Sequence, residues 1–162
     1  MESRRAAAAG AIFLVTMAAI LAALLFGTGP LDPFRTADPA AQRIAAGRAV
    51  YLQYCAACHG RNLEGQPDWQ SPLPSGRLPA PPHDKTGHTW HHPDEMLAGI
   101  TKKGILPYAP QGYESDMPAF GAVLTDEQIA ALWAYVKSTW PERERRYQAQ
   151  MTRQSELPKQ TQ

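Results

Sequence analysis

The sequence has little cysteine, almost no net charge and no pattern typical of β-strands. Only two of its 162 residues are cysteine, Cys55 and Cys58, which excludes a disulfide-rich scaffold but not a single bond or a covalently attached group. The 16 Lys and Arg nearly balance the 15 Asp and Glu, so nucleic acid is not an expected partner. No stretch alternates apolar and polar residues, and no internal repeat is present. The expected fold class is therefore all-α.

One long hydrophobic run stands near the start of the chain. Residues 6–26 contain no charge, and a helix of that length at about 1.5 Å per residue spans about 30 Å, the thickness of a bilayer core. Arg4 and Arg5 precede the run, which predicts a cytoplasmic segment 1–5 and export of everything that follows. The run is longer than a signal-peptide core, so we expect an uncleaved transmembrane anchor, with a cleaved signal peptide as the alternative.

After the anchor, the chain divides into a linker, a helical domain and a polar tail. Residues 27–37 hold two prolines and no periodic pattern, and they form the linker. The domain covers 38–140, and the tail covers 141–162 and is either a solvated helix or disordered. Three stretches of the domain combine helical spacing of apolar residues with matching start and stop residues: 38–55, 93–104 and 125–140. Between the first two lies a segment with six prolines, 66–82, which excludes regular structure there.

Both cysteines belong to one short motif, Cys55-Ala-Ala-Cys58-His59. This C-x-x-C-H spacing is the signature of covalent c-type haem attachment, in which each thiol forms a thioether to a porphyrin vinyl group. The adjacent His59 then supplies the proximal nitrogen to the iron. A redox dithiol would require a βαβ pattern, which is absent, and a zinc site would require a second cysteine pair or a suitably spaced histidine pair. The motif therefore predicts one haem c.

A haem that transfers electrons needs a second axial ligand, and methionine raises its potential. Two of the five methionines lie inside the predicted domain, Met96 and Met117. Met96 falls on the apolar face of a predicted helix, which favours core packing. Met117 lies in a proline-rich loop and is followed by Pro118, away from any predicted helix face. We therefore expect Met117 to be the sixth ligand.

These features resemble the class I c-type cytochromes over residues 38–140. In that family a glycine, an aromatic residue and the first haem cysteine follow one another at intervals of four, as Gly47, Tyr51 and Cys55 do here. The last helix of the family carries Leu-x-x-Tyr, which residues 132–136 match, and the sixth ligand is a methionine followed by proline, as in 117–118. The resemblance implies a small helical domain around one covalent haem, in which the first and last helices cross at Gly47.

The resemblance also implies a haem pocket. In the family, a proline carbonyl after the haem motif accepts a hydrogen bond from the axial histidine, which raises the basicity of that ligand. The loop is longer here than in the family, and Pro81 and Pro82 are both candidates for this acceptor. Phe120, shortly after Met117, is expected to pack beside the haem.

The segment 83–92 is rich in histidine, with four in ten residues: His83, His88, His91 and His92. Such side chains suit copper or zinc, so a second metal site is one interpretation. A second interpretation is a polar loop at the haem edge, in which Trp90 and the histidines bond to haem propionates or to the backbone. A third is that one of these histidines replaces Met117 as sixth ligand.

A six-coordinate haem has no open position for a substrate, so the expected function is single-electron transfer and not catalysis. The resemblance to anchored cytochromes implies membrane partners: a quinol-oxidising complex and a terminal oxidase, or a photosynthetic equivalent, with the chain free or a haem subunit. We expect a single-pass protein of the inner membrane with its haem domain in the periplasm. Two alternatives are a haem enzyme or ligand-binding protein with an open sixth position, and a metal-binding protein using the histidines of 83–92.

Overall fold

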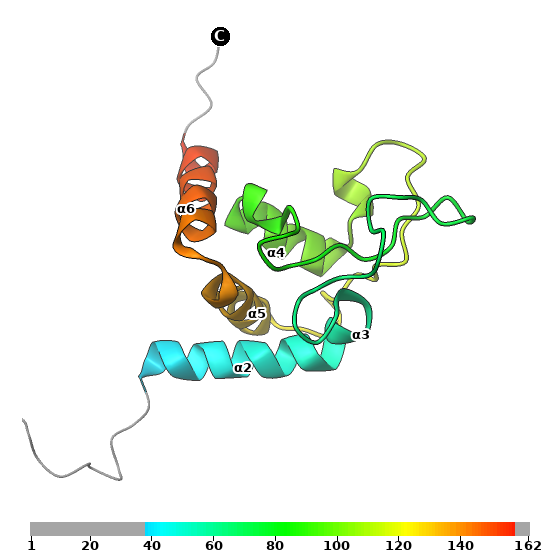
Figure 1. Cartoon of the computed structure of the whole chain (residues 1–162). Helices are drawn as coiled ribbons and strands as arrows, with labels where there is room; N and C mark the ends of the chain where they lie inside the picture. The colour runs from blue at the N-terminus through cyan, green and yellow to red at the C-terminus, as the bar shows by residue number, and fades with distance from the viewer. Residues whose placement is uncertain (1–37, 158–162) are drawn as a thin grey trace, which may run out of the picture. The chain divides into compact units, whose positions relative to one another are not determined.

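The computed structural model describes residues 38–157. The predicted anchor and linker and the last five residues of the tail lie outside the described residues. Within the described range the chain is helical and contains no strand (Figure 1). None of the helices between 38 and 157 has the length and hydropathy needed to cross a membrane. The elements, in chain order, are α2 (Pro39–Tyr54), α3 (Ala56–His59), the 3₁₀-helix η1 (Thr89–His91), α4 (Asp94–Lys103), the 3₁₀-helix η2 (Leu106–Tyr108), α5 (Asp126–Thr139) and α6 (Glu142–Glu156).

The ends of the main helices are set by local sequence. Asp38 caps α2, because its Oδ1 accepts from the Ala40 backbone N–H at 3.1 Å. At the start of α5, Thr125 and Gln128 form a reciprocal capping box, with bonds of 2.9 and 3.2 Å. The predicted helices over 38–55, 93–104 and 125–140 are thus confirmed, and 66–82 contains only turns and irregular backbone.

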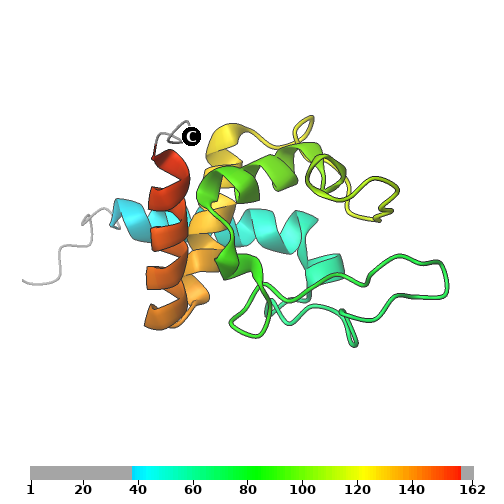
Figure 2. The ribbon, with the colours of Figure 1, turned by 90° about the horizontal axis from the view of Figure 1, so that it is seen from above.

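Helices α2 and α5 cross and make the most extensive contact between any two described elements (Figures 1 and 2). Gly47 lies at the crossing. A Cβ atom built there would overlap the Ala131 carbonyl and approach the Leu132 backbone nitrogen. The predicted crossing at Gly47 is confirmed, and the residues of α5 that Gly47 meets are Ala131 and Leu132.

The core lies between α2, α4 and α5. Its largest fully buried side chains are Tyr51 and Trp140, which are 0% and 1% exposed. Trp133 of α5 donates from Nε1 to the Thr101 hydroxyl of α4 at 3.1 Å, so this buried polar group is satisfied. Our expectation that Met96 packs in the core is wrong: Met96 is half-buried and lies outside the core cluster.

The tail packs against the domain through helix α6, which lies beside the 3₁₀-helix η1 that precedes α4 (Figure 2). Gln148 is only 3% exposed, and its amide donates to the His92 carbonyl at 3.2 Å and to Asp94 Oδ1 at 2.6 Å. Of the two alternatives for the tail, the helical one is observed, but the helix is not solvated on all sides. The polar sequence of α6 did not indicate this packing, because the buried side chain, Gln148, is hydrogen-bonded and not apolar.

Candidate functional site

The haem motif lies where the first helix ends. Cys55 caps the C-terminus of α2, and the next four residues form the single turn α3, whose last residue is His59. The His59 backbone N–H donates to the Cys55 carbonyl at 2.9 Å, so the first thiol and the histidine are joined by one helical turn. Cys55 is half-buried and Cys58 is exposed, and both thiols are free. Both sulfurs can therefore form thioethers.

The Cys55 thiol is not activated as in a redox dithiol. Burial raises its pKa to about 11, and the neighbouring Cys58 adds to the rise. A catalytic dithiol instead lowers the pKa of one cysteine so that a thiolate is present at neutral pH. A protonated Cys55 thiol agrees with the sequence pattern, which argues against a thioredoxin-like dithiol.

The imidazole of His59 is held by one specific hydrogen bond. Its Nδ1 lies 2.8 Å from the carbonyl oxygen of Pro81, which identifies Pro81, and not Pro82, as the acceptor that the sequence left undecided. The Nδ1–H donates in this bond, so Nε2 is the nitrogen left for iron. His59 is 8% exposed, and burial lowers its pKa, which favours the neutral imidazole that binds metals. The donor set therefore fits a c-type haem.

Two residues that sequence reasoning assigned no role at the site fix the backbone around His59. The Tyr51 hydroxyl donates to the Gly60 carbonyl at 2.7 Å and lies 3.2 Å from that of His59. Gly65 donates its N–H to the His59 carbonyl at 2.8 Å. A Cβ on Gly65 would overlap the peptide between Pro81 and Pro82, and its φ is +70°. Tyr51 was noticed for its spacing from Gly47 and Cys55 and not for a role at the site, and no pattern distinguishes Gly65 from other loop glycines.

His83 lies directly against His59. The two rings are stacked, with centroids 4.0 Å apart and planes 22° from parallel. Burial lowers the pKa of His83 well below its ordinary value, and His59 and His88 add to this effect. His83 is therefore neutral at physiological pH.

The other histidines of 83–92 have separate partners. His88 stacks on Trp69 with centroids 5.5 Å apart and meets His92 edge-on at 5.4 Å. His91 instead contacts Trp90 and Tyr147. The structure does not bring the four histidines to one centre, and no group of three or more His, Cys, Asp or Glu side chains in residues 38–157 is arranged to hold a metal ion.

Trp90, which we expected at the haem edge, packs toward α6. Its ring lies 5.4 Å from the Tyr147 ring, edge to face, and 5.9 Å from the Arg143 guanidinium. Its Nε1 is buried and has no hydrogen-bond partner among the described residues. A contact between Trp90 and haem stays a prediction.

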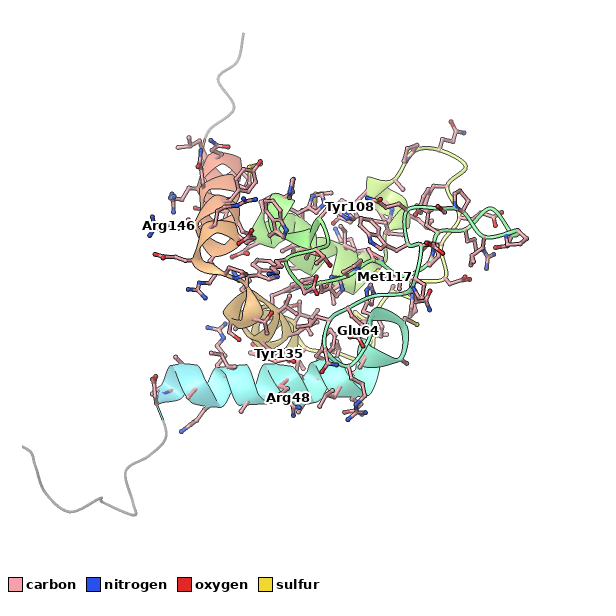
Figure 3. All side chains as sticks on the ribbon, in the orientation of Figure 1. Arg48, Glu64, Tyr108, Met117, Tyr135 and Arg146 are labelled. Atoms are coloured by element: carbon pink, nitrogen blue, oxygen red, sulfur yellow. The ribbon has the colours of Figure 1, made fainter. Side chains whose placement is uncertain are left out.

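Met117 lies on an irregular segment that docks at the ends of two helices. Phe120 and Gly121 donate their backbone N–H groups to Thr101 and Lys102 at the end of α4, at 3.0 and 2.9 Å. The Phe120 ring meets the ring of Tyr54, the residue before Cys55, with centroids 6.2 Å apart. Met117 itself is half-buried (labelled in Figure 3). The methionine segment is thus placed next to the haem motif, and ligation by Met117 stays a prediction.

Comparison with known proteins agrees with this geometry. The family model described as "Cytochrome C oxidase, cbb3-type, subunit III" matches residues 42–136, more than half of the chain, and the match includes Cys55, His59, Pro81 and Met117. No curated protein and no solved structure matches. When haem c is bound, its iron supplies one-electron redox chemistry. The chain belongs to this family, and its domain is a class I-like monohaem cytochrome c domain that binds haem c covalently.

Proposed function

We propose that this domain carries single electrons through a six-coordinate haem attached to Cys55 and Cys58, with His59 and Met117 as axial ligands. The observation that carries the proposal is the bond from His59 Nδ1 to the Pro81 carbonyl at 2.8 Å, which commits Nε2 to the iron. The methionine segment, docked beside Tyr54 through Phe120, supports the second ligand. With both positions filled, the haem exchanges electrons and has no site for a substrate.

Membrane attachment and partners are part of the same proposal. Residues 6–26 anchor the chain in the inner membrane, with the haem domain on the periplasmic side. The family description names a subunit of a cbb3-type oxidase, which supports association with a membrane oxidase complex. The chain receives electrons from a quinol-oxidising complex and passes them to a terminal oxidase, free in the membrane or as a haem subunit.

Carbon monoxide titration of the reduced holoprotein tests the ligation. Wild type should bind carbon monoxide poorly, because Met117 occupies the sixth position. Met117→Ala should keep its covalent haem, bind carbon monoxide readily and have a lower reduction potential, since the thioether favours ferrous iron.

Met96→Ala is the matched control, because it removes a half-buried methionine of the same domain and should change neither property. Ready binding of carbon monoxide by wild type would instead support a haem with an open sixth position. Opening of the iron by a change at His88, His91 or His92, with Met117→Ala behaving as wild type, would identify a histidine as the sixth ligand.

Fractionation of the native host tests the anchor and the partners. The mature N-terminus should lie at or near Met1, and the protein should stay with membranes after a high-salt wash. Mild detergent should release it together with haem-copper oxidase activity. A mature N-terminus between residues 27 and 38, or purification without any oxidase, would contradict the corresponding part of the proposal.

A further inference from the structure

His83 has an arrangement that haem binding and electron transfer as proposed above do not use. Its ring lies nearly parallel to that of His59, at a centroid separation of 4.0 Å and an interplanar angle of 22°. Pro81 bonds only to the edge of the His59 ring, at Nδ1. His83 instead covers a face of the ring, so the two contacts restrain different motions of the imidazole.

His83 is itself held from several elements. Its Nδ1 lies 2.8 Å from the Thr89 hydroxyl, which in turn lies 3.4 Å from the Pro82 carbonyl. The Thr89 hydroxyl thus links the His83 ring to the backbone of Pro82. The His83 backbone N–H donates to the Leu63 carbonyl at 2.8 Å, and the His83 carbonyl accepts from Trp140 Nε1 at 2.7 Å. The ring is thus fixed at both its side chain and its backbone.

A fixed flat surface against an imidazole restricts rotation of that imidazole about the bond from Nε2 to a metal. One hydrogen bond at Nδ1 bends easily and opposes this rotation only weakly, whereas a face-to-face neighbour opposes it through its van der Waals surface. In a haem protein, the orientation of the axial ring relative to the porphyrin nitrogens determines how the unpaired spin of ferric iron is distributed over the haem. Groups around a metal ligand tune the metal in this indirect way.

We propose that His83 is a positioning residue that sets the plane of the His59 imidazole over the haem. The inference rests on the proposed role of His59 as an axial ligand. It requires a flat ring at position 83 and does not require a titrating one. Phenylalanine should therefore replace His83 in this respect, and leucine and alanine should not.

Proton NMR of the ferric holoprotein measures this property directly, because the hyperfine shifts of the four haem methyl groups depend on the orientation of the axial ring. His83→Ala and His83→Leu should change the order or the spread of these shifts. His83→Phe keeps a flat ring but loses the bond to the Thr89 hydroxyl, so it should move these shifts far less than His83→Leu does. His88→Ala is the matched control, since His88 stacks on Trp69 and is exposed, and it should leave the pattern unchanged.

Thr89→Val provides a second test that does not remove the ring. It keeps the volume of a buried side chain but deletes the oxygen bonded to His83, so the methyl shifts should move in the same sense as in His83→Leu, by less. This variant remains informative if changes at position 83 prevent haem attachment.

The outcomes separate this inference from the function on which it rests. If wild type lacks the low-spin spectrum of a histidine–methionine haem, the proposed ligation fails. If wild type has that spectrum and either His83→Leu or Thr89→Val retains the wild-type methyl shifts, the positioning role of His83 is overturned while the proposed function stands. The same conclusion follows if His83→Phe shifts the methyl groups as strongly as His83→Leu.

Discussion

The two sides of the candidate haem site are built differently. On the side of His59, buried side chains donate to backbone carbonyls: Tyr51 to Gly60, His59 to Pro81, and Trp140 to His83. On the side of Met117, the segment before the methionine is largely exposed, and two of its acidic residues pair with Arg77. These are Glu114, at 3.2 Å, and Asp116.

This contrast has an energetic consequence. A buried donor or acceptor that loses its partner costs about 1–3 kcal/mol, because water cannot replace the bond. Exposed ion pairs contribute little, since water and salt screen them. Changes on the histidine side should therefore lower stability, whereas changes on the methionine side should alter access to the iron more than they alter stability. Three variants test this comparison.

The largest expected effect is that of Gly47→Val, which acts on the helix that carries Tyr51 and the haem motif. The new side chain would collide with the Ala131 carbonyl, which is backbone and cannot turn aside. We expect α2 and α5 to separate, with a loss of about 3 kcal/mol in the free energy of unfolding of the holoprotein, measured by denaturant titration. Ala46→Val, at the exposed neighbouring position, should lose about 0.5 kcal/mol from helix propensity alone. Equal stability of the two variants would show that the crossing is not tight.

Tyr51→Phe should have a smaller effect, confined to the histidine side. It deletes a hydroxyl that donates to the Gly60 carbonyl at 2.7 Å within a fully buried side chain. The free energy of unfolding should fall by about 1–3 kcal/mol. The control Tyr54→Phe removes a hydroxyl that only accepts from the exposed Gln53 amide, and it should stay within about 0.5 kcal/mol of wild type. If Tyr51→Phe lowers the free energy of unfolding no more than Tyr54→Phe does, buried and exposed bonds do not differ here in the way that the comparison requires.

Arg77→Gln should have the smallest effect on stability and a distinct effect on the iron. It breaks the exposed pairs with Glu114 and Asp116, so the methionine segment should move more freely. The association rate of carbon monoxide with reduced protein should rise a few-fold, while the melting temperature falls less than in Tyr51→Phe. Arg153→Gln makes the same charge change on the exposed side of α6 and should leave this rate as in wild type.

The dependence of the carbon monoxide rate on ionic strength provides a further test of the Arg77→Gln prediction. Salt screens exposed ion pairs, so it should raise the carbon monoxide rate of wild type but not that of Arg77→Gln. A melting temperature that falls as far in Arg77→Gln as in Tyr51→Phe would show that the methionine side is as firmly held as the histidine side.

Predictions from sequence succeeded where the determining interactions are local. The caps at Asp38 and Thr125 use residues within three positions of one another, so spacing alone is informative. They were less successful where exposure depends on distant partners. Met96 fell on an apolar helix face and yet is half-buried, and Gln148 looked solvated and yet is 3% exposed, because its partners His92 and Asp94 lie more than 50 positions away.

The sequence by itself determined the covalent chemistry, since the C-x-x-C-H spacing of residues 55–59 places two thiols and an imidazole within about one helical turn of backbone. It also determined the helical class, through capping residues and apolar spacing that act over a few residues. Only the tertiary structure decided which carbonyl binds His59 and that His83 covers its ring. Those choices depend on how a proline-rich segment of more than 20 residues returns to the haem motif, and such a path is fixed by long-range packing and not by local preference.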